Sequence, residues 1–320
     1  MNYDHIVHAV YNQPWAILPE TLAVITDLVR FRAEGGRLTE GEIRERIGVP
    51  PGAAMPQPRP AARNEGAVAV LPVFGVISQR MTLLSQMSGG TSIEQIAAAF
   101  RQAMADPNVK AIVFDVDSPG GGVSGVEELA TEIREARGSK PIVAQANSLM
   151  ASAAYWIGSA AEELVVTPSG EVGSIGVLAA HEDHSGELAQ QGVSVTLVSA
   201  GKFKAERSSF QPLSAEALAY LEQRVNDYYA TFVGAVAKGR GVPVDAVREH
   251  FGQGRLVGAK QAVQAGMADR VGTLSQTLAR LGVGRNAPRM PAALDGDAVP
   301  VAGAAGARRR ERERMRLRAY

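Results

Sequence analysis

The chain has 320 residues, a formal net charge of zero and no cysteine. Its hydrophobic content of 46% is ordinary for a globular core, and its length suits one large domain or two small ones. Without cysteine the chain can form no disulfide and supply no thiolate, which excludes a cysteine protease. Residues 308–318 hold seven arginines and two glutamates, so the neutral total hides a basic end and a net negative remainder.

The beginning of the chain does not resemble a secretory signal peptide. Residues 1–8 lack a basic segment followed by an uninterrupted apolar one, so no signal peptide is predicted. No apolar run in the sequence is long enough to span a bilayer. We therefore expect the protein to work in the cytoplasm of its host.

Composition divides the chain into four parts. Residues 1–49 are predicted to be a helical N-terminal extension, because apolar residues recur there at helical spacing: Leu22, Ile25, Leu28 and Val29. Residues 50–65 contain five prolines and are expected to be an extended linker. A main domain follows at 66–284. Residues 285–320, which are low in large apolar side chains and arginine-rich at the end, are expected to be disordered.

Strand-like and helix-like segments alternate within the main domain. Strands are predicted at 67–71, 73–77, 111–116, 142–146, 164–167, 177–179 and 193–198. Helices are predicted at 93–105, 126–136, 152–161, 186–191, 214–238 and 243–251. This order favours an α/β layered fold with a largely parallel sheet, in which sites usually lie beyond the carboxyl ends of the strands.

One serine stands where a predicted strand gives way to a predicted helix. Residues 149–156 read Leu-Met-Ala-Ser-Ala-Ala-Tyr-Trp, with Ser152 at the junction. A hydroxyl at such a turn lies beside the unpaired N–H groups of a helix start, which stabilise developing negative charge. Ser152 is therefore a candidate nucleophile, although serine is also a common helix N-cap.

A glycine-rich turn follows the strand predicted at 111–116. Residues 118–122 read Ser-Pro-Gly-Gly-Gly and match neither a P-loop nor a dinucleotide-binding motif. Three glycines allow a tight turn, and the same turn can aim backbone N–H groups at an oxyanion or a phosphate. The candidate nucleophile at the end of the next strand favours an oxyanion hole.

A base for the serine is sought further along, in residues 199–204 (Ser-Ala-Gly-Lys-Phe-Lys). Lys202 and Lys204 are both candidates for this base. On the residues alone, each is equally well explained as a loop lysine exposed to solvent. A lysine accepts a proton only when it is neutral, and desolvation favours the neutral form. Phe203 and Ala205 give Lys204 apolar or small neighbours, which permits such desolvation.

Four motifs occur in the order and spacing of the signal peptide peptidase A-type serine proteases, and residues 67–275 resemble that family. The motifs are residues 118–122, residues 150–155 (Met-Ala-Ser-Ala-Ala-Tyr), residues 173–177 (Gly-Ser-Ile-Gly-Val) and residues 201–204 (Gly-Lys-Phe-Lys). The resemblance implies a Clp-protease/crotonase-like fold and a Ser/Lys dyad that uses no cofactor and no metal.

The resemblance also assigns roles by position. It implies that Ser152 is the nucleophile, Lys204 the general base and Ser174 the hydroxyl that orients the lysine. It further implies an oxyanion hole, made by backbone N–H groups of Gly120, Gly121 and Ala153. Membrane-bound members usually have glycines where this chain has Ala153 and the following alanine, but alanine still supplies the N–H group.

Two further features are similar to the phage head-maturation branch of the family. They are residues 12–17 (Asn-Gln-Pro-Trp-Ala-Ile) and the Ser-Ala-Ala-Tyr-Trp form of the nucleophile motif. Other members carry a membrane anchor, and none is expected here because the sequence has no sufficiently long apolar run. The resemblance implies a homo-oligomeric protease that works inside the prohead and cleaves capsid, portal or scaffold proteins.

Several alternatives stay open on the residues alone. A Ser-His-Asp triad would take its base from His181 or His184, with Asp183 between them. A crotonase-type acyl-CoA enzyme would share the glycine turn but would not need residues 201–204. A host-type peptidase that degrades signal peptides or proteins, or an inactive protease-like assembly scaffold, would also fit. The arginine-rich tail could bind nucleic acid, contact other subunits or be solvated.

Overall fold

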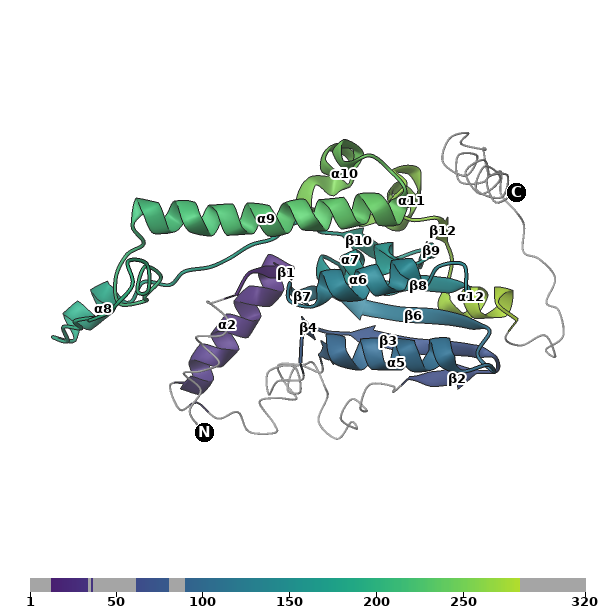
Figure 1. Ribbon diagram of the computed structural model, residues 1–320, viewed down its shortest axis with the longest axis horizontal. Helices are drawn as coiled ribbons and strands as arrows, with labels where there is room; N and C mark the ends of the chain where they lie inside the picture. The colour runs from purple at the N-terminus through teal and green to yellow at the C-terminus, as the bar shows by residue number, and fades with distance from the viewer. Residues whose placement is uncertain (1–12, 34–35, 37–61, 81–89, 283–320) are drawn as a thin grey trace. The chain divides into compact units, whose positions relative to one another are not determined.

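The computed structural model describes residues 13–33, 36, 62–80 and 90–282 (Figure 1). Contacts group Met1–Val283 into one compact unit and Gly284–Tyr320 into another, and all described residues belong to the first. The expected tail at 285–320 and most of the expected linker at 50–65 therefore lie outside the described residues.

The elements are as follows, in chain order. The strands are β1 (Trp15–Ile17), β2 (Arg63–Glu65), β3 (Val68–Phe74), β4 (Ile77–Ser78), β5 (Thr91–Ser92), β6 (Ala111–Ser118), β7 (Gly120–Gly122), β8 (Ile142–Ala151), β9 (Glu163–Val166), β10 (Glu171–Gly173), β11 (Leu256–Gly258) and β12 (Arg270–Val271). The helices are α2 (Pro19–Ala33), α5 (Ile93–Ala105), α6 (Val126–Glu135), α7 (Ala153–Ser159), α8 (Ser185–Gln190), α9 (Ala215–Arg240), α10 (Val244–His250), the 3₁₀ turn η1 (Gly252–Gly254), α11 (Ala259–Gln264) and α12 (Leu274–Arg280).

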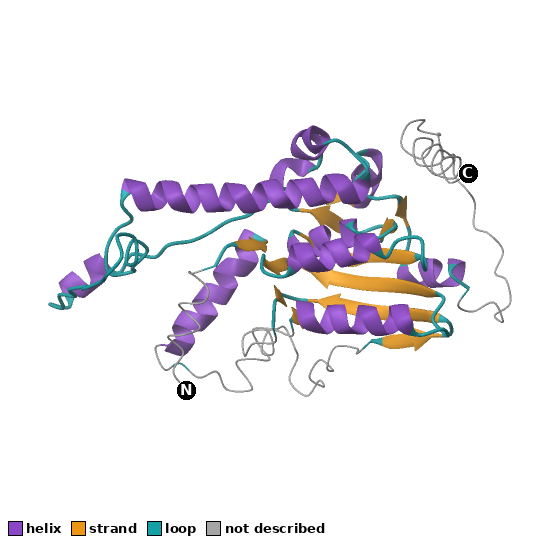
Figure 2. Cartoon of the chain, in the orientation of Figure 1, coloured by secondary structure: helices purple, strands orange, loops and turns teal. Residues whose placement is uncertain are grey.

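The main sheet has eight strands and a parallel centre. Its order is β11-β10-β8-β6-β3-β2, with β9 also joined to β8 and β12 joined to β9. Strands β3, β6 and β8 are mutually parallel, while β2 and β11 pair antiparallel at the edges. Figure 2 shows these long strands side by side, with helices packed along them. The expected α/β layered fold with a largely parallel sheet is confirmed.

Helices cover both faces of this sheet. The larger apolar core joins one face to α5, α6, α7 and the C-terminal end of α9, and α9 contacts both α6 and α7 (Figure 1). On the other face, Leu274, Leu278 and Leu281 pack against a smaller cluster that contains Val113 and Val143. Parallel strands need cover on both faces, and the nearly continuous apolar runs of β6 and β8 meet that need.

Local sequence explains where the covering helices begin and end. Helix α5 begins where the Ser92 side chain accepts a hydrogen bond from the Gln95 N–H, and its apolar residues at helical spacing face the core. Helix α9 begins in the same way at Ser214 and ends at Gly241, which adopts a left-handed conformation with φ 66°. The helices predicted at 93–105 and 214–238 correspond to α5 and α9.

A second, four-stranded sheet carries the glycine turn, in the order β1-β7-β4-β5. Strand β7 pairs with β4 in parallel and with β1 in antiparallel orientation. A side chain at Gly121 would collide with the neighbouring strand, because its Cβ would stand 1.8 Å from the Ile77 carbonyl oxygen. Glycine is therefore required where β7 passes β4.

Some predicted elements are wrong. Residues 193–198 form no strand: their alternating apolar residues fit a strand pattern, but the side chains of Val193, Val195, Leu197 and Val198 are 41–95% exposed. At 177–179 the structure has a single bridge, between Leu178 and Trp15, in place of a strand. The N-terminal extension contains the helix α2, but β1 precedes it and residues 37–49 lie outside the described residues.

Within the described ranges, no helix combines the length and the apolar character that crossing a bilayer requires. The longest helix, α9, carries charged residues in its first and last turns.

Candidate active site

Ser152 occupies a strained turn between β8 and α7. Its backbone angles are φ 54° and ψ −117°, a conformation that costs a non-glycine residue on the order of 1–3 kcal/mol. Two backbone hydrogen bonds hold it: the Ser152 N–H donates to the Gly173 oxygen (2.7 Å), and its carbonyl accepts from the Trp156 N–H (2.9 Å). A strained strand-to-helix turn is the geometry that presents a nucleophile beside a helix start.

The Ser152 side chain does not cap helix α7. No hydrogen bond runs from α7 backbone to its hydroxyl; instead, Oγ donates to the Gly176 carbonyl at 3.4 Å. The residue is 1% exposed. The N-cap alternative therefore does not account for this serine.

The glycine turn lies directly beside Ser152. Gly120 has φ 99°, and a Cβ at this residue would stand 3.0 Å from the Ser152 Cβ. The Gly120 N–H donates to Ser118 Oγ (3.2 Å), whose hydroxyl in turn donates to the Gly75 carbonyl (2.6 Å). Ala153 is the first residue of α7, where backbone N–H groups have no partner within the helix.

Ser174 lies on the neighbouring strand end. Strand β10 runs parallel to β8 with Gly173 opposite Ala151, so Ser174 follows the residue whose carbonyl holds Ser152. Ser174 also has a positive φ of 51°, and its N–H donates to the Arg255 carbonyl at 2.9 Å. The structure thus brings together Ser152, Ser174 and the glycine turn.

Lys204 does not join this group within the single chain. Its side chain is exposed in the turn at 201–207, and no hydrogen bond or ion pair of the described residues links it to Ser152 or Ser174. Lys202 is also exposed, and its Nζ lies 2.9 Å from Glu216 Oε1 and 4.4 Å from the centre of the Phe203 ring. The role of Lys204 stays a prediction.

The alternative in which a histidine is the base also lacks a supporting contact with Ser152 among the described residues. His184 lies 3.4 Å from carboxylate oxygens of both Glu182 and Glu187, at the start of α8. Hydrogen bonds from Ser185 lower the pKa of Asp183. In the part of the chain that is described, none of His181, Asp183 and His184 bonds to Ser152.

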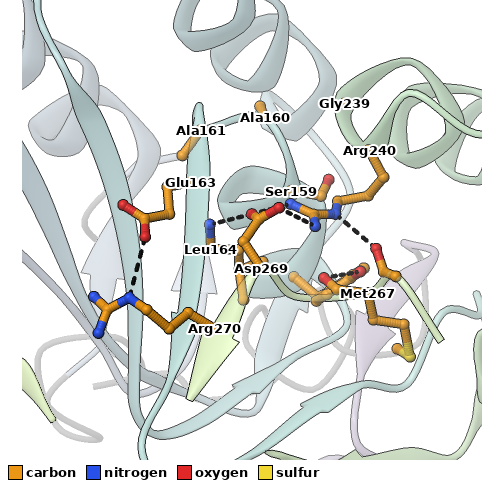
Figure 3. A network of polar contacts seen from close by, with 12 residues as sticks. Ser159, Ala160, Ala161, Glu163, Leu164, Gly239, Arg240, Met267, Asp269 and Arg270 are labelled. Carbon is orange, nitrogen blue, oxygen red and sulfur yellow. Dashed lines mark hydrogen bonds and ion pairs between the residues drawn. The ribbon is translucent and has the colours of Figure 1, made fainter. Parts of the chain in front are cut away.

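Two arginines that the sequence analysis did not single out make partly buried contacts behind the site: Arg137 at the C-terminal end of α7 and Arg240 at the end of α9. Arg137 donates to four carbonyl oxygens, those of Ser159, Ala160, Ala161 and Gly239. Arg240 is 1% exposed and makes two hydrogen bonds to the Asp269 carboxylate, at 2.8 and 3.0 Å (Figure 3). No motif marks these residues, because their partners are backbone carbonyls and one carboxylate that only the fold brings close.

The first turn of α7 is fixed by aromatic side chains. The Tyr155 hydroxyl donates to the Met267 carbonyl (2.9 Å), and burial raises the pKa of this tyrosine. The Trp156 ring stacks on Phe232 of α9 at a centroid distance of 4.4 Å, while its Nε1 donates to Glu127 of α6 (3.0 Å). These contacts immobilise the helix that follows Ser152, and rigid support of this kind keeps a nucleophile in place.

A serine on a strained turn between a parallel strand and a helix, next to a glycine turn, defines the class of site found in serine hydrolases. The sequence profile of peptidase family S49 matches residues 134–287. The chain is also 31% identical over 301 residues to the head-tail preconnector protein of Enterobacteria phage P21, covering 89% of this chain and 58% of that protein. These matches show that residues 134–287 of the chain are similar to peptidase family S49.

Two further similarities extend this comparison. Capsid assembly protease C of Escherichia phage lambda is 30% identical over 283 residues, which cover 84% of this chain and 63% of that protein. The chain thus spans about three fifths of the length of these two relatives. Among solved structures, a ClpP1 variant from Listeria monocytogenes aligns with a TM-score of 0.42 and 13% identity, covering 65% of this chain and 94% of that one.

Proposed function

We propose that the protein is a serine endopeptidase whose nucleophile is Ser152, whose general base is Lys204 and whose lysine-orienting hydroxyl is Ser174. The protease domain would comprise residues 66–284. The observation that carries this proposal is the backbone of Ser152, a non-glycine residue held at φ 54° beside the glycine turn with its hydroxyl free of any capping role. Strain at a single polar residue is characteristic of a functional site.

The chemistry follows from these groups. Ser152 Oγ attacks the carbonyl carbon of the scissile bond and gives its proton to neutral Lys204 Nζ. The oxyanion of the tetrahedral intermediate accepts hydrogen bonds from the N–H groups of Ala153 and of the glycine turn, where the Gly120 N–H exchanges Ser118 Oγ for the oxyanion. Collapse of the intermediate breaks the C–N bond, and the leaving amine takes the proton from the lysine. Water then hydrolyses the acyl-enzyme by the same route.

Lys204 must approach a Ser152 for this to occur, and the surface around it supports an assembly of several copies. Eight of the ten large apolar side chains that are exposed among the described residues lie within 193–220. They are Val193, Val195, Leu197, Val198, Phe203, Phe210, Leu218 and Tyr220. Apolar surface gathered in this way marks a protein–protein contact. In the proposed homo-oligomer, residues 193–220 are covered by a neighbouring copy and Lys204 is thereby desolvated.

The proposed substrates are capsid, portal or scaffold proteins, cleaved in the host cytoplasm or inside the prohead. The names of the two phage relatives support this assignment. The test is to incubate the parent protein and Ser152→Ala with candidate capsid and scaffold proteins and to sequence the fragments. Loss of one hydroxyl leaves the fold intact but removes the covalent route, so we expect no fragments from Ser152→Ala and unchanged thermal unfolding. Equal cleavage by the variant would refute the nucleophile.

A further inference from the structure

Strand β1 lies between the glycine turn and the segment that follows Ser174. On one edge, Trp15–Ile17 pairs antiparallel with Gly120–Gly122. On the other edge, Trp15 exchanges two hydrogen bonds with Leu178: the Trp15 N–H donates to the Leu178 oxygen (2.8 Å), and the Leu178 N–H donates back (2.9 Å). This short strand is therefore bonded through its backbone on both edges.

The strand runs toward the nucleophile. The bridge partner Leu178 is two residues from Gly176, whose carbonyl accepts the hydrogen bond from Ser152 Oγ. On the opposite edge, a Cβ on Gly120 would stand 2.2 Å from the Ala16 carbonyl oxygen and 3.0 Å from the Ser152 Cβ. Both edges thus place β1 next to Ser152.

We propose that β1 is an internal pseudosubstrate, which occupies the groove that binds the extended segment of a substrate on the amino side of the scissile bond. This inference rests on the proposed function. Pairing with the free edge of a strand is a general way of binding an extended peptide. A substrate in the place of β1 would run antiparallel to β7 and bring its carbonyl groups toward Ser152 and the glycine turn.

The side chains of β1 define the class of peptide that fits. Ala16 is 0% exposed and faces the main core, where only a small residue has room. Trp15 and Ile17 point the other way, into a small apolar cluster with Val76 and Leu178. Val76 and Leu178 stay in place when α2 departs, so the groove accepts an extended segment in which two apolar residues flank a small one.

The chain leaves the groove immediately after β1. The Leu18 N–H donates to the Pro119 carbonyl (3.0 Å), and helix α2 begins at Pro19. Trp15 and Ile17 share their apolar cluster with residues of α2 and not with the main core. Ala16 is the one residue of β1 in the main core, so the unit made of β1 and α2 departs by withdrawing a single small side chain from that core. A substrate can enter only after it does.

An engineered disulfide tests this directly, because the chain has no cysteine of its own. Residues paired by two hydrogen bonds in antiparallel strands have Cα atoms about 5.5 Å apart, within disulfide range. In the full-length double variant Trp15→Cys/Leu178→Cys, oxidation would lock β1 in the groove. We expect the reduced form to cleave a fluorogenic peptide at least ten-fold faster than the oxidised form. The single variant Trp15→Cys is the control and should not respond to the same oxidant.

A binding measurement separates this inference from the proposed function. A fluorescein-labelled peptide with the sequence of residues 13–18 should bind the reduced double variant at least ten-fold more tightly than the oxidised one, whether or not either form cleaves. If the reduced form binds the peptide more tightly but neither form cleaves, the proposed function is rejected and the peptide-binding groove under β1 is supported. Equal binding and equal cleavage in the two redox states would overturn the pseudosubstrate and make β1 a permanent strand.

A second double variant tests the proposal without the engineered cysteines, in case the cysteine variant does not fold. Trp15→Ala/Ile17→Ala removes the apolar side chains that anchor β1. The control pair, Leu274→Ala/Leu278→Ala, removes apolar side chains from a different cluster, which packs on the main sheet. Only the first pair should increase binding of the labelled peptide relative to the parent. The same gain in both pairs would show general loosening and would count against the proposal.

Discussion

At the scale of single residues, the active site is distinguished by backbone conformation. Ser152 and Ser174 both have positive φ, and besides them only Gln253 among the described non-glycine residues does. Two of these three residues thus fall on adjacent strand ends at the candidate site. Neighbouring hydrogen bonds to Gly173 and Arg255 impose the conformations, so the strain is maintained by the sheet and not by the serines themselves.

The two lysines near residue 203 should respond differently to substitution. Lys204→Arg and Lys204→Ala should both reduce kcat by at least about 1000-fold, because guanidinium stays protonated and cannot accept the serine proton. Lys202→Ala should retain most activity, since its exposed pair with Glu216 contributes at most about 1 kcal/mol. Initial rates on a peptide substrate measure both effects.

The reverse pattern is equally informative. If Lys202 is essential and Lys204 is not, the positional match to the family is displaced by two residues. If neither lysine matters and His181→Ala abolishes activity, the base is a histidine and the triad alternative replaces the dyad.

Asp115 makes stability depend on pH. It is a buried carboxyl on β6, and its Oδ1 has no hydrogen-bond partner among the described residues. Burial raises its pKa above the ordinary value, and a hydrogen bond with Asn147 only partly offsets this. The folded state therefore holds the proton more tightly than the unfolded state, so this contribution to stability is present below about pH 4 and is lost as pH rises through the folded pKa.

We therefore expect Asp115→Asn to raise the free energy of unfolding at pH 7 relative to the parent and to lose this advantage near pH 4. Urea denaturation between pH 4 and pH 8 measures the difference. Asp227→Asn is the control, because Asp227 is an exposed carboxyl on α9 and is not among the charges that act on Asp115. A difference between Asp115→Asn and the parent that does not vary with pH would contradict the assignment.

At the scale of elements, helix α7 is the part that connects the core to the site. Its C-terminal end is held by Arg137, which donates to the Ser159 and Ala160 carbonyls, and α7 also contacts α9. Helix α9 is tied in turn to β9, because Arg240 pairs with Asp269 and Asp269 accepts the Leu164 N–H at 2.8 Å (Figure 3). Since α7 has only seven residues, support at its C-terminal end also positions Ser152.

Arg240→Met should therefore destabilise the fold by at most about 3–5 kcal/mol, because it leaves the Asp269 carboxylate, which is only 22% exposed, without its partner. Arg240→Met/Asp269→Leu should recover part of that loss, since it removes the isolated charge as well. Chemical denaturation of the three proteins gives both values. A cost below about 1 kcal/mol for the single substitution would mean that the pair contributes little.

How far the elements could be predicted depends on what determines each of them. Helix α5 was predictable because its cap and its apolar spacing are local. Strand β1 was not, because Trp15–Ile17 becomes a strand only through pairing with residues more than 100 positions away. Residues 193–198 have the pattern of a strand but pair with no strand among the described residues. Ser152 and the glycine turn were found from local motifs, whereas Arg137 and Arg240 carry no local signal.

At the scale of the whole molecule, the single chain leaves one region incompletely packed. The C-terminal end of α9 is buried around Phe232–Arg240, whereas its N-terminal half exposes apolar residues such as Leu218 and Tyr220. The same region contains Lys204, which the proposed mechanism requires beside a Ser152. One assembly step would bury the apolar side chains and desolvate the lysine together.

We therefore predict that activity depends on protein concentration. Specific activity toward a peptide should rise steeply over a dilution series, in parallel with the oligomer seen by sedimentation, because dilution separates the copies and returns Lys204 to solvent. Leu218→Glu/Tyr220→Glu should move both transitions to higher concentration, since charges at the contact oppose association. Val244→Glu, at an exposed apolar residue outside 193–220, is the matched control and should move neither. A fully active monomer with constant activity per subunit would instead place the complete dyad within one chain, with residues 201–207 folding onto Ser152 of the same molecule.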